Sequence, residues 1–365
     1  MSKISKNKKY LELEGVRVYI NKKDNTIQLI STDEDLTGKP FQITLNQGTP
    51  SEQSLRELLV EKGMVNEVID PFYSIPKHIK YPKTRGFKNV DTDTDDKWNL
   101  VPIGVTTNKE PVCLDLKENP NTLIAGLPGG GKTVALKNIL IHTLKDEEKW
   151  KIAAIDLRKI ELNYLTPYAN SVLGIARQSD DAENLLNHIQ GIIKDRKIQM
   201  ATQEINNYRD LKNEKGKPVP SIMLAIDAAD ELLFGKNLSL NDNNDYWAAK
   251  KALIHHLLQQ ILEEGAYAGV YTTLNISHPE DLDPKFKKLF GTLMNVGGLD
   301  GFGFMELFNQ RFSDKAQERL TTGQSLLKSE SVIVNETRKT FTEKELLPFQ
   351  IYYSSDDLKT ELSIK

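Results

Sequence analysis

The sequence predicts an α/β protein with a mostly parallel sheet flanked by helices, preceded by a small α+β module at the N-terminus. From residue 121 onward, short apolar runs alternate with longer amphipathic segments, and this rhythm is typical of parallel strands joined by helices. A glycine-rich segment follows the first of these runs and precedes a helical pattern. Near the N-terminus, apolar residues instead alternate one by one with polar ones, which indicates antiparallel strands.

The composition is that of a folded protein without a strong overall charge. The 365 residues include 39% hydrophobic and 27% charged side chains, which excludes an intrinsically disordered chain. Forty-eight basic residues against 51 acidic ones leave a formal net charge of -3. Any contact with nucleic acid is therefore expected to be local rather than spread over the surface.

Cysteine usage and hydropathy exclude further classes. Cys113 is the single cysteine, and the six histidines show no metal-binding spacing, so we expect neither a disulfide nor a cysteine-rich zinc site. The sequence has no apolar run long enough to span a membrane, and its first residues lack the apolar core of a signal peptide. We therefore expect a cytoplasmic protein without a membrane segment.

Residues 1–70 predict the small N-terminal module. Residues 16–20 and 26–30 alternate apolar and polar side chains on either side of a polar turn, which predicts a β-hairpin. Residues 41–45 predict a third strand. The segment 49–52 combines an N-cap, a proline at the first helical position and a capping-box glutamate, so a helix is expected to begin there.

The rest of the chain predicts a linker over 71–98, a main domain over 99–345 and a C-terminal tail over 346–365. The linker is rich in proline and charge and has no apolar period. Six apolar runs predict the strands of the main domain, at residues 121–126, 151–157, 171–176, 221–227, 269–276 and 292–298. Two stripes at helical spacing predict packing helices, at 185–193 and 253–262.

The segment GLPGGGKT matches the P-loop pattern at every fixed position and lies between a predicted strand and a predicted helix. Such a loop binds the phosphates of ATP with its backbone N–H groups and with the start of the helix. Lys132 is expected to reach the β and γ phosphates, and the Thr133 hydroxyl to bind Mg²⁺. The predicted nucleotide-binding residues are Gly126, Leu127, Pro128, Gly129, Gly130, Gly131, Lys132, Thr133 and Val134.

The apolar strand SIMLAID ends in Asp227, which predicts the Walker B aspartate that holds the Mg²⁺ shell together with Thr133. The next residue commonly is the glutamate that polarises the attacking water, but here it is Ala228. Two explanations stay open. One is an engineered change from glutamate to alanine that traps bound ATP. The other is a natural relocation of the base to Glu231, or the loss of hydrolysis.

At these residues the chain resembles the FtsK/SpoIIIE (HerA-FtsK) family of DNA translocases. The run 101–133 is similar to the segment that leads into the family's P-loop, with a Pro-x-Gly turn and a hairpin carrying an Asp-Leu pair. The run 155–165 resembles the family's Asp-Pro-Lys-x-x-Glu-Leu segment, with Asp156, Arg158, Glu161 and Leu162 in the matching places and Leu157 in place of the proline.

After Walker B the chain departs from the family pattern. The family's Thr-Gln-Arg-Pro sequence is replaced here by residues 276–279, so that Ser277 stands in the place of the sensor glutamine. Asn275 at the strand end is a candidate to replace that sensor, and a plain loop-capping role is the alternative.

The resemblance covers about residues 99 to 335 and implies a RecA-like core assembled as a homo-hexamer around DNA. The implied function is an ATP-dependent DNA translocase or helicase, similar to the short members that act in plasmid or mobile-element DNA transfer, conjugation or replication. A relaxase or a replication initiator is a possible partner of the N-terminal module. Lys285, Lys287 and Lys288 are candidates to line a DNA channel, although a solvated helix face is the simpler reading.

An arginine from the neighbouring subunit commonly completes such a site. Arg311, Arg319 and Arg338 are candidates, and for each of them a solvated surface position is the simpler reading.

Two other functions remain compatible with the sequence. Type VII protein-secretion ATPases use the same kind of domain, and a nucleotide-gated assembly platform would bind ATP without turning it over. Ala228 and Ser277 are the residues that favour the assembly platform. ATP hydrolysis that DNA stimulates would distinguish a translocase from such a platform.

Overall fold

The computed structural model divides the chain into two units, residues 1–72 and residues 73–365. The residues that it describes are 10–13, 16–21, 26–31, 41–44, 81–82, 97–233, 245–309, 320–340 and 345–354, and side chains are described from residue 81 onward except at 245–248.

The first unit contains a four-stranded antiparallel sheet in the order β1-β2-β3-β4. Its strands are β1 (Tyr10–Leu13), β2 (Val16–Asn21), β3 (Thr26–Ser31) and β4 (Phe41–Thr44). The predicted hairpin and third strand are confirmed by β2, β3 and β4, whereas β1 was not predicted. The helix expected after residue 49 lies outside the described residues.

The second unit is built on a sheet of twelve described strands in the order β15-β14-β6-β5-β16-β13-β12-β7-β11-β10-β8-β9. The strands from β12 to β9 pair in parallel. They are β12 (Thr292–Val296), β7 (Asn121–Ala125), β11 (Val270–Ile276), β10 (Ser221–Asp227), β8 (Trp150–Asp156) and β9 (Val172–Ala176). The predicted α/β fold with a parallel core is therefore confirmed.

The other half of this sheet is antiparallel, which makes the whole sheet mixed. Its strands are β13 (Gln324–Ser329), β16 (Leu347–Ile351), β5 (Leu100–Thr106), β6 (Pro111–Asp115), β14 (Ser331–Val334) and β15 (Thr337–Thr340). The hairpin predicted ahead of the P-loop is formed by β5 and β6. The expected Pro-x-Gly turn is instead a bulge inside β5, between Pro102 and Gly104.

Two predicted boundaries need correction. Residues 347–351, assigned to a tail, form β16 inside the sheet between β13 and β5, and Phe349 is completely buried. A proline and a glutamine interrupt the apolar pattern of this strand, and for that reason the sequence did not predict it. Trp98, assigned to the linker, is buried and packs against Trp150 in a tilted arrangement and against Tyr271 edge-on, with ring centroids 5.6 Å and 5.9 Å away.

Helices cover both faces of the parallel half, because alternate residues of its strands point to opposite sides. Ile124 packs with α2 in one core, whereas Leu123 packs with α3 and α5 in the other. The helices are α2 (Lys132–Leu144), α3 (Ser179–Thr202), α4 (Ala229–Leu233), α5 (Asp245–Glu264), α6 (Pro284–Lys287) and α7 (Gly301–Phe308). Short 3₁₀ turns are η3 (Asn163–Leu165), η4 (Tyr208–Asp210), η5 (Gly265–Ala268) and η6 (Pro279–Asp281).

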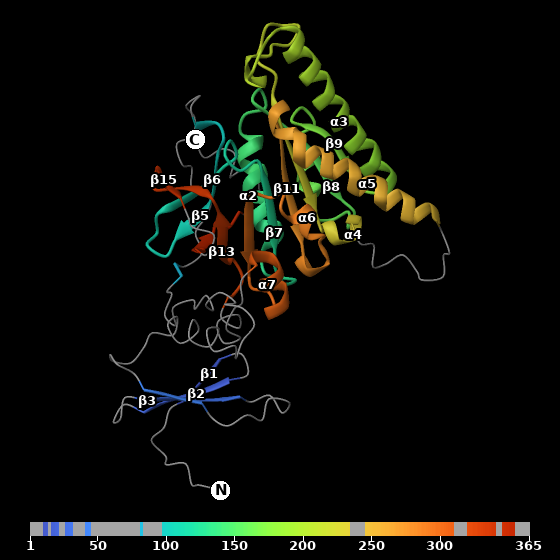
Figure 1. Ribbon diagram of the computed structural model, residues 1–365. Helices are drawn as coiled ribbons and strands as arrows, with labels where there is room; N and C mark the ends of the chain where they lie inside the picture. The colour runs from blue at the N-terminus through green and yellow to red at the C-terminus, as the bar shows by residue number, and fades with distance from the viewer. Residues whose placement is uncertain are drawn as a thin grey trace. The chain divides into compact units, whose positions relative to one another are not determined.

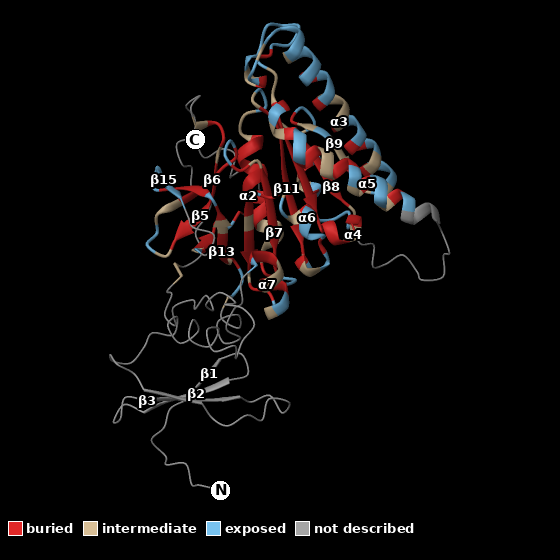
Figure 2. Cartoon of the chain, viewed as in Figure 1, coloured by how far each residue is buried: buried red, intermediate tan, exposed pale blue. Residues whose placement is uncertain are grey.

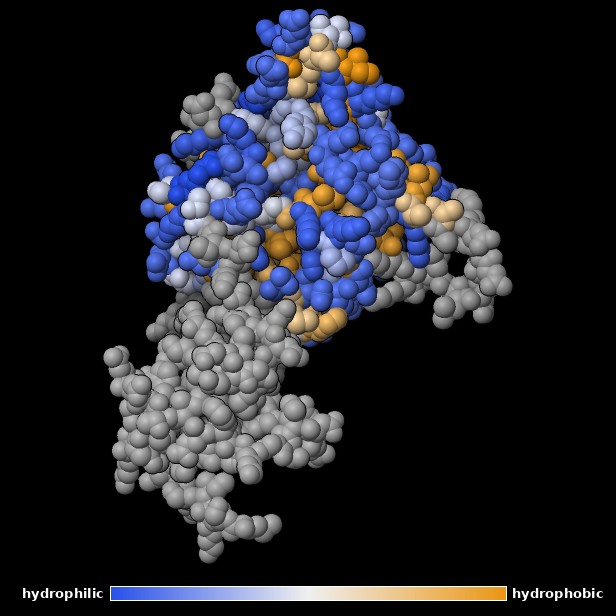
Figure 3. All heavy atoms as spheres, in the orientation of Figure 1, coloured by the Kyte–Doolittle hydropathy of each residue, from blue (hydrophilic) through white to orange (hydrophobic). Residues whose placement is uncertain are grey.

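Helices α3 and α5 lie side by side, and the strands beneath them are buried (Figures 1 and 2). The apolar stripe predicted for α3 faces the core, as shown by the buried Leu186 and Ile189. The stripe predicted for α5 is shorter than expected, because Leu253 is 40% exposed whereas Leu257 and Leu258 are buried. The drawn face of the second unit is mostly hydrophilic, with small apolar clusters between polar side chains (Figure 3).

Candidate nucleotide site

The predicted P-loop lies between the end of β7 and the start of α2. Gly129 and Gly131 have φ values of 76° and 108°, a backbone region that glycine occupies without steric cost. The loop turns sharply there, and α2 begins at Lys132 with no side-chain cap. Free N–H groups in the first turn of the helix therefore remain available to an anion.

Lys132 folds back over this loop. Its amine donates to the carbonyl oxygens of Gly126 and Leu127 at 2.6 Å and 3.2 Å. Burial lowers the pKa of Lys132, and the nearby carboxylates of Asp230 and Asp227 partly oppose that shift. A phosphate group would offer this amine a stronger partner than two neutral carbonyls.

Two turns from elsewhere in the chain hold the P-loop in place. Gly298 accepts from the Leu127 N–H at 3.0 Å, and the Gly323 N–H donates to Gly130 at 2.9 Å. A Cβ added at Gly297 would lie 2.2 Å from the Cα of Gly130. This support was not predicted, and its signal in the sequence was the pair of glycines that follows the apolar run of β12.

Thr133 and Asp227 come together across the site. The Thr133 hydroxyl donates to the Asp227 carboxylate at 3.4 Å, and the Asn275 amide donates to the same oxygen at 2.7 Å. Strand β11 lies between the P-loop strand and the Walker B strand, which brings Asn275 next to Asp227. Burial raises the pKa of Asp227, and the hydrogen bond from Asn275 counteracts the rise.

The loop after β11 is fixed by Asp230, a residue that was not predicted to belong to the site. Its carboxylate accepts from the N–H groups of Ser277 and His278 at 2.8 Å and 3.1 Å. Asn275 therefore contacts the Walker B aspartate, whereas Asp230 caps the loop after β11. Ser277 contributes its backbone N–H to that cap.

Ala228 and Glu231 lie at the start of α4. Ala228 is buried and has a φ of 50°, so no carboxylate extends from the position where a glutamate was expected. The Glu231 carboxylate pairs with Arg158 at 3.7 Å, and its side chain is 28% exposed. The predicted alternative base is thus engaged by a cation.

Thr133 and Asp227 offer the hard oxygen ligands that Mg²⁺ prefers, and Mg²⁺ in nucleotide sites needs only one or two protein ligands beside the phosphates. These two side chains therefore fit the ion. Among the described residues no group of three or more histidine, cysteine or acidic side chains is arranged to hold a metal by itself. Leu127, Pro128 and Gly129 form the exposed outer part of the loop, and Val134 is half-buried at its end.

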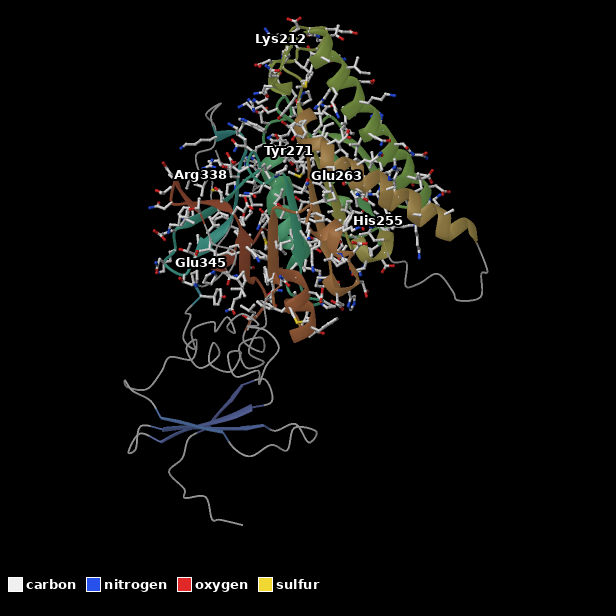
Figure 4. All side chains as sticks on the ribbon, in the orientation of Figure 1. Lys212, His255, Glu263, Tyr271, Arg338 and Glu345 are labelled. Atoms are coloured by element: carbon white, nitrogen blue, oxygen red, sulfur yellow. The ribbon has the colours of Figure 1, made fainter. Side chains whose placement is uncertain are left out.

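Among the described residues, the other predicted cations either have partners within the chain or are exposed. Lys287 bonds to Glu306 in α7, while Lys285 and Lys288 are exposed. Arg338 lies on the edge strand β15 (Figure 4) and pairs with Asp115 at 2.6 Å. Arg311 and Arg319 lie outside the described residues.

This fold and site define a P-loop nucleotide-binding domain in which an extra strand separates the P-loop strand from the Walker B strand. The model of the FtsK/SpoIIIE family matches residues 85–261, and this part of the chain is similar to that family. None of the described helices combines the length and apolar character that a membrane span requires.

Curated relatives match the chain over part of their length. DNA translocase SftA of Bacillus subtilis is 26% identical over 141 residues, covering 36% of this chain and 14% of SftA. DNA translocase FtsK of Treponema pallidum is 28% identical over 148 residues, covering 38% of this chain and 18% of FtsK. The chain thus matches less than a quarter of either relative.

Solved structures share the fold at low sequence identity. The pCW3 conjugation coupling protein TcpA, as a monomer with ATPγS, has a TM-score of 0.62 at 18% identity, covering 96% of this chain and 89% of TcpA. ATPases 2 and 3 of EssC from Geobacillus thermodenitrificans have a TM-score of 0.57 at 16% identity, covering 77% of this chain and 50% of that one.

Proposed function

We propose that the chain is the ATPase unit of a DNA translocase that binds ATP with Mg²⁺ and acts as a homo-hexameric ring. The observation that carries the proposal is the joint presence of Lys132, Thr133 and Asp227 at the P-loop of a domain similar to the FtsK/SpoIIIE family. The curated relatives are named DNA translocases. DNA contact through a few side chains per subunit agrees with the formal net charge of -3.

In the proposed cycle the phosphates of ATP enter the loop 126–131, and the Lys132 amine moves from two backbone carbonyls onto them. Bound Mg²⁺ would neutralise charge on the β and γ phosphates, held through Thr133 and Asp227. Asn275 orients the Asp227 carboxylate through its hydrogen bond of 2.7 Å, and this bond favours the ionised form against the effect of burial. The same amide lies on β11, so it connects the Mg²⁺ site to the loop that Asp230 caps.

We further propose a cytoplasmic role in plasmid or mobile-element transfer, with the first unit recruiting a relaxase or replication initiator. TcpA is a conjugation coupling protein, and its likeness to this chain extends over nearly the whole length of the chain. A helicase role in replication is a variant of this proposal. Assays that measure strand separation on single- and double-stranded DNA would distinguish it from a role in transfer.

The test is ATP turnover by this chain and by Ala228→Glu, each without DNA, with single-stranded DNA and with double-stranded DNA. Lys132→Ala is the control for contaminating ATPases, because it removes the amine that meets the phosphates. Stimulation by DNA in either form supports a DNA motor, and the preferred strand type names its track. Turnover that DNA leaves unchanged in both forms contradicts the proposal.

A nucleotide-gated assembly platform is the second candidate, and Ala228 is the observation that favours it. A buried alanine with a φ of 50° follows the Walker B aspartate, so the usual carboxylate is missing. ATP-dependent ring formation without turnover in either form would support this candidate. A protein-secretion role, suggested by the fold of EssC, would show as turnover that responds to a protein substrate and not to DNA.

A further inference from the structure

If the chain hydrolyses ATP, a group other than residue 228 has to orient the attacking water and accept its proton. Five carboxylates lie at the carboxyl ends of β8 and β10, in the turn after β8 or in helix α4 after β10, namely Asp156, Glu161, Asp227, Asp230 and Glu231. A carboxylate that has no other donor or cation beside it is the most available to bind and deprotonate a water molecule. The hydrogen bonds of these five groups therefore decide between them.

Four of the five carboxylates have partners within the chain. Asp227 accepts from Thr133 and Asn275, and Glu231 pairs with Arg158. Both oxygens of Asp230 accept backbone N–H groups. Both oxygens of Asp156 do the same, at 3.0 Å each. In the described part of the chain, the Glu161 carboxylate has no hydrogen bond or ion pair.

The turn after β8 brings Glu161 to this edge of the sheet. Asp156 is the register partner of Asp227 on the neighbouring parallel strand. It accepts from the N–H groups of Lys159 and Leu162, so residues 157–162 fold back over the end of β8. Leu162 is completely buried and anchors the turn, whereas Glu161 immediately before it is exposed.

The electrostatics of Glu161 agree with this placement. Although Glu161 is largely exposed, desolvation of its carboxyl raises the pKa of Glu161. The negative charges of Asp227 and Asp156 raise it further, and the Arg158 cation opposes the rise. The Asp156 carboxylate, which accepts from the Leu162 N–H, joins this turn to the strand beside Asp227. A carboxylate with a raised pKa accepts a proton more readily than an ordinary glutamate.

We propose that Glu161 is the base for ATP hydrolysis in this chain, in place of the glutamate missing at residue 228. The inference rests on the proposed ATPase function. The water oxygen forms a bond to the γ phosphorus, and the bond from that phosphorus to the β–γ bridging oxygen breaks. The water proton passes to the Glu161 carboxylate, and the products are ADP and inorganic phosphate. Glu231 keeps its place as the partner of Arg158.

The test compares Glu161→Gln, Glu231→Gln and the exposed control Glu214→Gln in the full chain, with ATP turnover and binding of a fluorescent ATP analogue as readouts. Glutamine keeps the size of the side chain and removes its basicity. We expect Glu161→Gln to lower kcat by about 100-fold or more while nucleotide affinity changes by less than about 3-fold. Glu214→Gln should match the unchanged chain, and Glu231→Gln should lose less turnover than Glu161→Gln.

Retention of kcat within about 3-fold in Glu161→Gln, or a larger loss in Glu231→Gln, would overturn the proposal. A chain that is inactive as it stands but active as Ala228→Glu also overturns it and leaves the motor function intact. If neither form hydrolyses ATP with or without DNA, both the base and the motor function are rejected. The failure of one proposal is thereby distinguished from the failure of the other.

Discussion

Replacement of Gly297 by alanine tests the contact that holds the P-loop from the side. Gly297 has a φ of 71°, and an added Cβ would lie 2.2 Å from the Cα of Gly130 and 2.6 Å from its carbonyl oxygen. Both atoms belong to the backbone, so neither can move aside as a side chain would. Either the turn after β12 or the phosphate loop has to shift.

The expected magnitude has two parts. A left-handed backbone costs a residue with a Cβ about 1–2 kcal/mol, and overpacking of a close contact costs about 1–3 kcal/mol. Gly297→Ala should therefore reduce the free energy of unfolding by about 2–5 kcal/mol. Gly216 offers a matched control, because its φ is 72° and an added Cβ would meet no atom within 4 Å. Gly216→Ala should reduce the free energy of unfolding only by the backbone cost of about 1–2 kcal/mol.

Urea unfolding and binding of a fluorescent ATP analogue provide the assay. We expect Gly297→Ala to be less stable than Gly216→Ala and to bind nucleotide at least about 10-fold more weakly, because a displaced Gly130 disrupts the backbone groups that meet the phosphates. Gly216→Ala should bind nucleotide as the unchanged chain does. Equal losses of stability in the two variants, with nucleotide affinity intact in both, would refute the idea that this contact shapes the loop.

Three further substitutions have expected outcomes. Burial raises the pKa of the Cys113 thiol from 9.0 to about 12, so the folded state disfavours the thiolate and stability is lost as pH rises above the unfolded value. Between about pH 8 and pH 10.5 the chain should lose about 2 kcal/mol more unfolding free energy than Cys113→Ala does, and equal pH profiles would contradict this. Arg196 is buried and donates to two backbone carbonyls at 2.7 Å each. Arg196→Met should therefore lower the free energy of unfolding, measured by urea titration, by about 3 kcal/mol. Arg196→Lys should recover less than half of that loss. Asn275→Leu removes the amide that donates to Asp227 and should weaken Mg²⁺-dependent ATP binding by about 10-fold or more. The control is Asn295→Leu, because Asn295 is equally buried but donates to Ala125. This control should change the affinity for ATP much less.

The parallel half of the sheet could be predicted because its signals are local. The segment NTLIAGLPGGGKT contains a buried strand, a glycine turn and a helix start within 13 residues. The antiparallel strand β16 could not be predicted in this way. Its partners β13 and β5 precede it by about 20 and 250 residues, and the burial of Phe349 follows only from that pairing.

The site shows the same division between local and distant signals. The P-loop glycines, Lys132 and Asp227 lie in short motifs with fixed spacing, and the structure brings them together. Asp230 and Gly297 carry no such motif. Their importance comes from segments that meet only in the folded chain, Asp230 with the loop after β11 and Gly297 with the P-loop.

The antiparallel half also reaches the phosphate loop, which gives this part of the fold a function. Gly323, in the turn before β13, donates its N–H to Gly130, and Ile351 of β16 donates its N–H to Gly323. The loop is thus hydrogen-bonded to the turn after β12 on one side and to the turn before β13 on the other. A loop ordered in advance loses little conformational entropy when phosphate binds. Strand β16, which was not predicted from the sequence, therefore supports the P-loop, which was predicted from a short motif.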